Sequence, residues 1–264
     1  MAITTKDLLV AAAAAAQPVQ MFKSGARTTV ANVWFSTVDL AGSPGAGVLA
    51  GTSVAAGVVP DATTVGCPAL TSFGANTGYL TSLEVSNTVP GRHRLFDMLF
   101  KAGAFPFNAV QTLAAQPSFS ARIPAANYNG TSIWLECVTA FTGLQSIAVT
   151  YTNQAGTTGR TTGTIATGVA PTVGRMLQLP LQAGDAGVQK IESVTSTVAT
   201  VGTFNLLILR SLVDVRVRIA NDLVRFGPDS LMQQVYASSA LVMLINADGA
   251  TSGLPEIQVA IGNG

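Results

Sequence analysis

Few residues of this chain could carry acid–base or nucleophilic chemistry, and the sequence does not group them. The single histidine, His93, lies between Arg92 and Arg94. A histidine that acts as a general base needs a nucleophile and an orienting acid nearby in space, and the sequence contains no GxSxG nucleophile turn. Flanked by two arginines, His93 is expected to face solvent or an interface at the start of a helix.

The acidic residues are dispersed along the chain. Asp222 and Asp229 form the tightest grouping, and Asp185 lies in the sequence Ala-Gly-Asp-Ala-Gly, where an aspartate is typical of a turn. Glycoside hydrolysis needs two carboxyl groups that face one bond, and calcium loops need several oxygen ligands at short spacing. The sequence shows neither pattern. We therefore predict that the protein is not an enzyme and that it binds no cofactor.

The cysteines do not indicate a metal site. Cys67 and Cys137 lie far apart and have no CxxC spacing. A structural zinc site needs about four converging soft ligands, and two cysteines with one histidine are too few. We predict two buried thiols, leave a single disulfide between them open, and expect no metal.

The chain carries very little charge. Only 10% of its 264 residues are charged, the net charge is +1, and the mean hydropathy is +0.43. An ordinary soluble domain carries about 25% charged residues. The basic residues form no stripe of the kind that binds phosphates, so nucleic acid is not an expected partner. The sequence shows no membrane-spanning segment, so a membrane is not expected either. The shortage of charge predicts a surface that faces other protein chains.

The N-terminus predicts a short helix. Thr4 can cap it, Asp7 follows at capping-box spacing, and Pro18 comes after the alanine-rich run. We interpret residues 1–26 as an arm that packs on a neighbouring subunit, and residues 27–264 as the body. Leu8, Leu9 and Val10 are the predicted interface residues of this arm.

Residues 92–102 predict a second, internal helix. Its apolar side chains would form one broad surface, and Gly103 stands where a helix C-cap is expected. Two interpretations stay open: the helix closes one end of a β-sandwich, or it inserts into a neighbouring subunit. Under the second interpretation the interface would also contain Leu95, Phe96, Leu99 and Phe100.

The rest of the sequence predicts β-structure with long loops rich in Gly, Ala and Thr. Strands are expected at residues 131–139, 146–152, 175–181, 188–194, 204–209, 213–219, 239–245 and 256–261. Trp34 and Trp134 lie in strand patterns and are expected in the core. The prediction is an all-β fold with a β-sandwich or jelly-roll core, with a possible sub-boundary at residues 106–124.

The composition and sequence pattern of the chain resemble those of structural proteins of tailed-bacteriophage virions. The resemblance rests on the alanine-rich N-terminal helix, the sparse charge, and the stretch of residues 184–194 that leads to residues 203–209. No pattern is long enough for the spine helix of the common major capsid fold. The resemblance therefore implies a capsid cement or decoration protein with a jelly-roll core, located in the virion after assembly in the host cytoplasm. Its implied partners are further copies of itself in a homo-oligomer and the major capsid protein.

Other functions stay open. Within the same class, the chain could be the coat subunit, a tail-tube subunit or a head–tail joining subunit. From another class, it could be a secreted adhesin or a carbohydrate-binding β-sandwich, for which the aromatic content of 6% is low.

Overall fold

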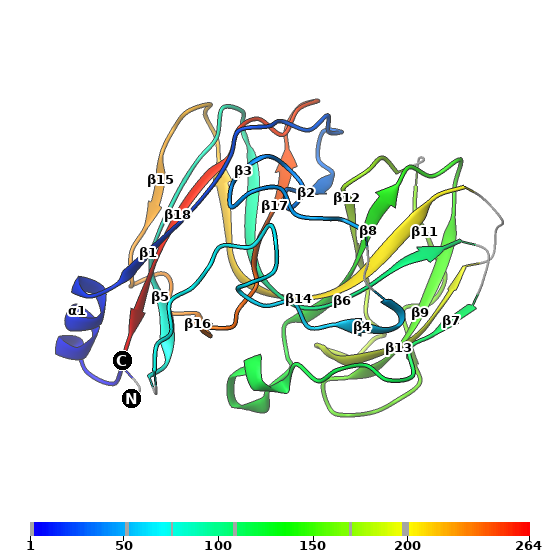
Figure 1. Ribbon diagram of the computed structural model, residues 1–264, viewed down its shortest axis with the longest axis horizontal. Helices are drawn as coiled ribbons and strands as arrows, with labels where there is room; N and C mark the ends of the chain where they lie inside the picture. The colour runs from blue at the N-terminus through cyan, green and yellow to red at the C-terminus, as the bar shows by residue number, and fades with distance from the viewer. Residues whose placement is uncertain (1–2, 51–52, 75, 108–109, 169–170, 197–200) are drawn as a thin grey trace. The chain divides into compact units, whose positions relative to one another are not determined.

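The computed structural model describes residues 3–50, 53–74, 76–107, 110–168, 171–196 and 201–264 (Figure 1). The described residues form one α-helix, two short 3-10 helices and many antiparallel strands. The helix is α1, Lys6–Ala14, and the 3-10 helices are η1, Ser120–Arg122, and η2, Pro124–Ala126. The predicted all-β class is confirmed.

The chain divides into two compact units. Unit 1 comprises Met1–Gly47, Asp61–Asp97 and Leu212–Gly264, and unit 2 comprises Val48–Pro60 and Met98–Ser211. Two long strands, β6 (Gly91–Pro106) and β14 (Thr203–Val217), begin in one unit and end in the other. The predicted division into an arm of residues 1–26 and a body concerns assembly and stays a prediction.

Unit 1 is built on a sheet with the strand order β15-β5-β18-β1-β3, and β16 also pairs with β5. Alternate side chains of β18 are buried, as expected for a sheet with one face on the core. A second set of pairings joins β17 to β2 and to the first residues of β6. The strands are β1 Gln17–Lys23, β2 Trp34–Ser36, β3 Gly42–Ser43, β5 Gly78–Ser86, β15 Val224–Phe226, β16 Gln234–Val235, β17 Leu241–Ala247 and β18 Glu256–Asn263.

Unit 2 contains an antiparallel sheet in which β9 and β13 are central, and a second group in which β8 pairs with β12 and with β14. Its core contains a cluster of aromatic rings, with Phe107 and Phe204 centroids 4.6 Å apart. The remaining strands of unit 2 are β4 Ser53–Val58, β7 Val110–Thr112, β8 Thr131–Thr139, β9 Ser146–Asn153, β10 Arg160–Thr161, β11 Ile165–Ala166, β12 Arg175–Leu179 and β13 Val188–Ser196.

The predicted N-terminal helix is confirmed, with its cap one residue later than expected. Thr5, not Thr4, has extended backbone angles, and its side-chain oxygen accepts a hydrogen bond from the Leu8 backbone N–H. The helix ends at Ala14, and Pro18 lies inside the following strand β1. The helix α1 lies against β18 and β5. It is too short to cross a membrane, and no other α-helix is formed by the residues that the structure describes.

The predicted internal helix at residues 92–102 is wrong, because these residues form most of β6. Residues Leu95–Phe100 are buried without a break, so the segment has no helical stripe of apolar residues. It is a strand covered on both faces, which short apolar runs do not distinguish from a helix. Gly103 lies within this strand and does not cap a helix.

The strands predicted in the second half of the chain are confirmed. Residues 131–139 form β8 with the expected ends, and residues 146–152 form β9. The two strands predicted at 204–209 and 213–219 join into the single strand β14, which ends at Val217. A hairpin joins β9 and β10, in which Arg160 of β10 pairs with Tyr151 of β9.

Candidate functional site

The sequence suggested that His93 lies at the surface. The structure instead buries it in β6 of unit 1, where it is 1% exposed. Its Nε2 atom lies 3.0 Å from the Asn87 side-chain nitrogen, which also donates to the Ser252 carbonyl oxygen. Burial lowers the pKa of the imidazole to about 4. The ring is therefore neutral at physiological pH and accepts a hydrogen bond from Asn87. Because successive side chains of a strand point to opposite faces, those of Arg92 and Arg94 point away from the face of β6 that His93 occupies.

Arg92 and Arg94 form an ion cluster with one carboxylate. Their guanidinium groups lie 2.7 Å and 2.5 Å from Asp214 Oδ2. The Arg94 guanidinium also stacks over the Trp34 ring at 5.0 Å, so Trp34 is only partly buried and lies at the edge of the core. Trp134, by contrast, is fully buried as predicted. The Arg-His-Arg segment at residues 92–94 thus contributes to packing and surface pairing.

Four of the predicted interface residues are wrong. Leu95, Phe96, Leu99 and Phe100 are at most 1% exposed, and they belong to the interior of the folded chain. They pack inside the protein because β6 is covered on both faces, so they have no surface to offer a partner. This outcome agrees with the alternative that the segment serves the core.

The other three predicted interface residues lie on α1. Leu8 and Val10 are exposed, and Leu9 is partly buried. Ala12 is the buried residue of this helix. The helix therefore keeps apolar side chains on its outer surface, and their contact with a neighbouring subunit stays a prediction.

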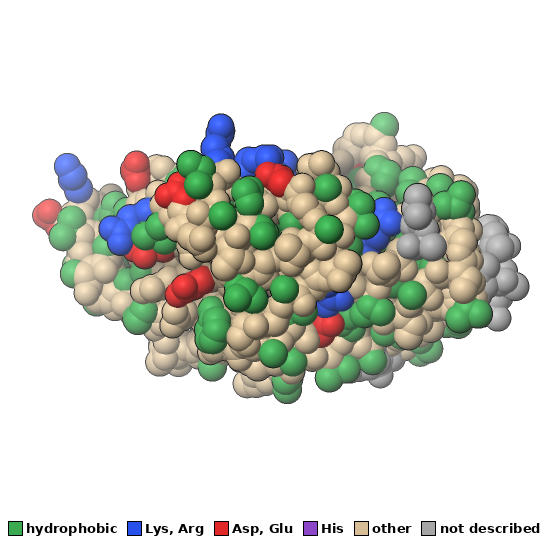
Figure 2. Space-filling view, turned by 90° about the horizontal axis from the view of Figure 1, so that it is seen from above, with side chains coloured by type: hydrophobic (Ala, Val, Ile, Leu, Met, Phe, Trp, Pro, Cys, Tyr) green, Lys and Arg blue, Asp and Glu red, His purple; other side chains and the backbone are tan. Residues whose placement is uncertain are grey.

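Charge is distributed unequally between the two units. In unit 1, many charged side chains are exposed, among them Lys6, Asp7, Arg92, Arg216, Arg218, Asp222, Arg225, Asp229, Asp248 and Glu256. In unit 2, every charged residue is described and none is exposed. Lys101, Arg122, Glu136 and Arg210 are buried, and Arg160, Arg175, Asp185, Lys190 and Glu192 are partly buried. On the face of the molecule in Figure 2, charged side chains are few, and uncharged polar and apolar atoms cover most of the area.

Unit 2 nevertheless exposes large apolar side chains. The most exposed are Val201 at 70%, Val48 at 66%, Val110 at 65% and Leu144 at 64%. Single exposed apolar residues are normal on soluble proteins, but here no fully exposed charge accompanies them. This combination is typical of a surface that is covered by protein.

A polar network supports the hairpin of unit 2. Asp185 accepts hydrogen bonds from the Tyr151 hydroxyl at 2.7 Å, the Asn153 amide at 2.7 Å and the Arg160 Nε at 2.9 Å. The bond from Arg160 is the largest cause that lowers the pKa of Asp185 to about 2. Burial, with the bond to Asp185, raises the pKa of Tyr151 to about 12. The sequence predicted a turn at Asp185 but not that its carboxylate holds three elements together.

A second carboxylate supports the same hairpin. Glu192 in β13 accepts hydrogen bonds from the Thr152 hydroxyl at 2.8 Å and from the Gly159 backbone N–H. Both acids are used to hold loops.

The described part of the chain brings no three metal-ligating side chains together. Cys67 and Cys137 are both buried, as predicted, and they are not joined by a disulfide. The chain therefore offers no coordination set for a structural metal among these residues.

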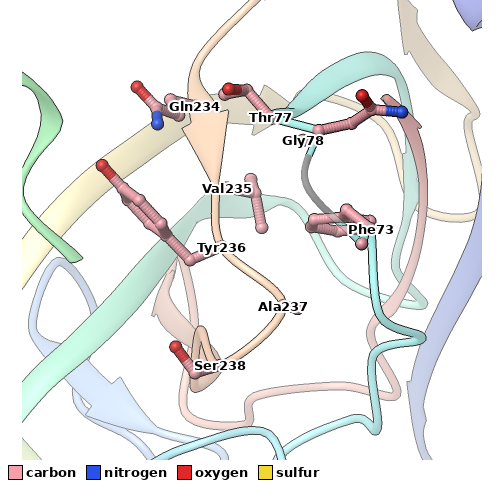
Figure 3. Close-up of a pocket in the computed structure, with 10 residues that line it drawn as sticks. Phe73, Thr77, Gly78, Gln234, Val235, Tyr236, Ala237 and Ser238 are labelled. Carbon is pink, nitrogen blue, oxygen red and sulfur yellow. The ribbon is translucent and has the colours of Figure 1, made fainter. Parts of the chain in front are cut away.

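One open pocket of about 290 Å³ lies in unit 1. Phe73 and Val235 point toward each other at its floor, and Tyr236 lies on the other side of β16 (Figure 3). Asn76 and Gln234 add amide groups to the lining, which contains no charged residue and no histidine. The pocket could hold a small polar molecule but has no group for acid–base catalysis.

Comparisons with known proteins do not assign the chain to a family. No protein-family model matches it, and no curated protein matches it. Among solved structures, T=1 particles derived from infectious bursal virus match with 11% identity, 94% coverage of this chain, 77% coverage of that chain and a TM-score of 0.18. Infectious bursal disease virus of the Gt strain matches with 11% identity, coverages of 94% and 81%, and a TM-score of 0.16. Scores this low carry no argument about fold or function.

Proposed function

We propose that this protein is a non-enzymatic structural subunit of a bacteriophage virion, namely a cement or decoration protein that forms homo-oligomers and stabilises the capsid. The observation that carries the proposal is the surface of unit 2, on which no charged side chain is fully exposed. A domain that meets water on all sides keeps charge at its surface for solubility. A subunit that buries this surface in an assembly does not need it.

The division of charge suggests which unit makes the contacts. Unit 2 exposes Val48, Leu144 and Val201 without exposed charge, which matches the core of a protein–protein interface. Unit 1 carries the exposed ionic residues, so most of its surface stays in contact with water. This assignment replaces the apolar residues of β6 as the proposed interface, and it keeps α1 as a possible further contact. The jelly-roll connection of the strands belongs to this proposal as well.

The test is the state of association of the purified protein. Light scattering combined with negative-stain images should show discrete oligomers, shells or tubes at micromolar concentration. A stable monomer at high concentration that also fails to bind phage capsids would contradict the proposal. Tubes would favour a tail-tube subunit and closed shells a coat subunit, and addition of the protein to undecorated heads identifies a cement protein.

A pair of matched variants locates the interface. Leu144 in unit 2 and Ile219 in unit 1 are exposed to almost the same extent, at 64% and 66%. Leu144→Glu should weaken association by about tenfold or more, because burying an unpaired carboxylate costs more than about 1.4 kcal/mol. Ile219→Glu should leave association unchanged. Equal effects of the two substitutions would refute the assignment of the interface to unit 2.

The carbohydrate-binding alternative has one place in the structure where it can be tested. The pocket at Phe73 and Tyr236 combines aromatic rings with the amide of Gln234, a combination that suits sugars. A glycan array with the purified protein tests it. Saccharide binding that is lost in Tyr236→Ala would favour the adhesin interpretation over the virion subunit.

A further inference from the structure

Three reactive side chains meet in the interior of unit 2 without a role in the proposed interface. Lys101 lies on β6, Glu136 on β8 and Asn205 on β14. They are 7%, 2% and 0% exposed. Asn205 and Glu136 stand directly opposite each other in the pairing of β14 with β8. Polar groups buried this deeply need an explanation, because removing them from water is costly.

The amine and the amide contact the same oxygen atom. Lys101 Nζ lies 3.6 Å from Glu136 Oε2, and Asn205 Nδ2 donates a hydrogen bond of 2.8 Å to that oxygen. The Lys101 ammonium also donates to the Val48 carbonyl oxygen at 3.0 Å, and Asn205 Nδ2 donates to the Leu49 carbonyl oxygen. These contacts hold a nucleophile, a carboxyl group and a carboxamide within one small space.

The oxygen atom of the Asn205 amide is not held. Asn205 Oδ1 is buried and makes no hydrogen bond. It lies over Gly103, where any added Cβ atom would collide with it. Rotation of the amide about its Cβ–Cγ bond exchanges the two polar atoms and presents Oδ1 to Glu136. A protonated Glu136 can then donate to Oδ1 and make the amide carbon a better electrophile.

The surroundings exclude water from this group. The side chains of Lys101, Glu136 and Asn205 are all buried, so bulk water does not reach them. Exclusion of water prevents hydrolysis of the groups that would react. A neutral amine is the form of a lysine able to attack a carbonyl carbon.

We propose that unit 2 forms an intramolecular isopeptide bond between Lys101 and Asn205, with Glu136 as the proton-transferring group. Glu136 takes a proton from Lys101 Nζ, and the neutral amine attacks Asn205 Cγ to form the new C–N bond. Glu136 gives this proton to Nδ2, the Cγ–Nδ2 bond breaks, and ammonia leaves. Glu136 then takes a second proton from Nζ, which leaves a neutral secondary amide. The reaction needs no oxidant, reductant or cofactor, and the fixed positions of the groups supply the effective concentration that drives it. It does not depend on the proposed assembly role.

The alternative is an ordinary buried ion pair with a neighbouring amide, and mass spectrometry distinguishes the two. Intact mass measured under denaturing conditions should be lower than the mass of the sequence by one molecule of ammonia, after correction for N-terminal processing. Digestion should release a branched peptide in which Lys101 is joined to Asn205. An intact mass equal to that of the sequence, unchanged after prolonged incubation of the folded protein, would overturn the proposal.

Variants test the role of each group. Glu136→Gln keeps the size of the side chain but cannot transfer the proton, so the ammonia loss and the branched peptide should disappear. Lys101→Arg should abolish the bond too. Lys23 is another buried lysine, 2% exposed in unit 1, which donates to the backbone oxygens of Leu40 and Pro44. Lys23→Arg is therefore the matched control and should keep the ammonia loss. An ammonia loss that persists in folded Glu136→Gln would exclude the assigned role of Glu136.

Discussion

Acidification from pH 7 to pH 5 should destabilise unit 1 through a single group, His93. The imidazole is buried in β6 and accepts a hydrogen bond from Asn87. Protonation would place a positive charge in the core and turn Nε2 into a donor that faces the Asn87 amino group. The folded protein therefore resists protonation until the pH falls to about 4.

The size of the effect follows from the two pKa values. In the unfolded chain the imidazole titrates near 6.5, and in the folded chain near 4. Between these values the unfolded chain binds more protons, so the free energy of unfolding is highest above pH 6.5 and decreases as the pH falls toward 4. The full loss is about 3 kcal/mol, and the share lost between pH 7 and pH 5 is about 2 kcal/mol.

Urea denaturation at pH 7, 6 and 5 measures this loss. The chain has one histidine, so one imidazole signal in the proton NMR spectrum gives the pKa of His93 directly. His93→Gln is the matched control, since its amide can accept the bond from Asn87 and does not titrate. The free energy of unfolding of this variant should decrease by much less than 2 kcal/mol over the same range.

Because the pKa of Asp185 is low, this residue changes the free energy of unfolding in a lower pH range than His93 does. Its pKa is about 2 in the folded protein and near 3.8 without its partners, so the stability that it adds is present above pH 3.8 and is lost as the pH falls toward 2.

An NMR pKa of His93 near 6.5 would refute the reasoning. So would a wild-type free energy of unfolding that changes between pH 7 and 5 no more than that of His93→Gln.

Further predictions concern packing, the hairpin and the arm. Gly57→Ala should destabilise the protein by about 2–4 kcal/mol in urea denaturation. The reason is that Gly57 has φ +68 and an added Cβ would collide with the Phe100 ring. An unchanged urea midpoint would show that the Gly57 backbone does not closely approach the Phe100 ring. Asp185→Ala should lower the thermal unfolding midpoint by removing the acceptor of Arg160, and a thermal melt at pH 7 that matches wild type would contradict it. Deletion of residues 1–15, which ends before β1, should leave circular dichroism of the β-structure intact and weaken association in light scattering. Normal association of the truncated protein would disprove the arm.

The elements that the sequence predicts well are those with a local signature. The helix α1 has a capping threonine and an acidic first turn, and both act within a few residues. Strands such as β9 and β18 carry alternating apolar residues between turn residues, so their pattern is visible without knowledge of their partners. The hairpin of β9 and β10 is marked by the turn at Asn153 and Gly156.

The elements that the sequence predicts poorly depend on distant partners. The apolar run in β6 has the composition of a helix face, and its pairing with distant strands makes it a strand. One of these strands is β17, which pairs from Leu241–Asp97 to Ala247–Gly91, and β4 and β14 also pair with β6. The burial of His93 follows from the same pairing, because Ile245 stands opposite it. The Lys101, Glu136 and Asn205 group joins three strands that are far apart in the chain. No spacing rule could have found it.

The structure also shows where the few charged residues of the chain lie. The composition alone suggests that the few charged residues are spread thinly over the surface, but several serve the interior instead. Arg122 donates to the backbone oxygens of Pro60 and Met98, and Asp97 accepts from the Ser239 hydroxyl. A buried charge of this kind adds nothing to solubility, because water does not reach it. The surface of unit 2 is therefore poorer in charge than 10% implies. Both the small number of charged residues and their positions favour a surface that protein covers.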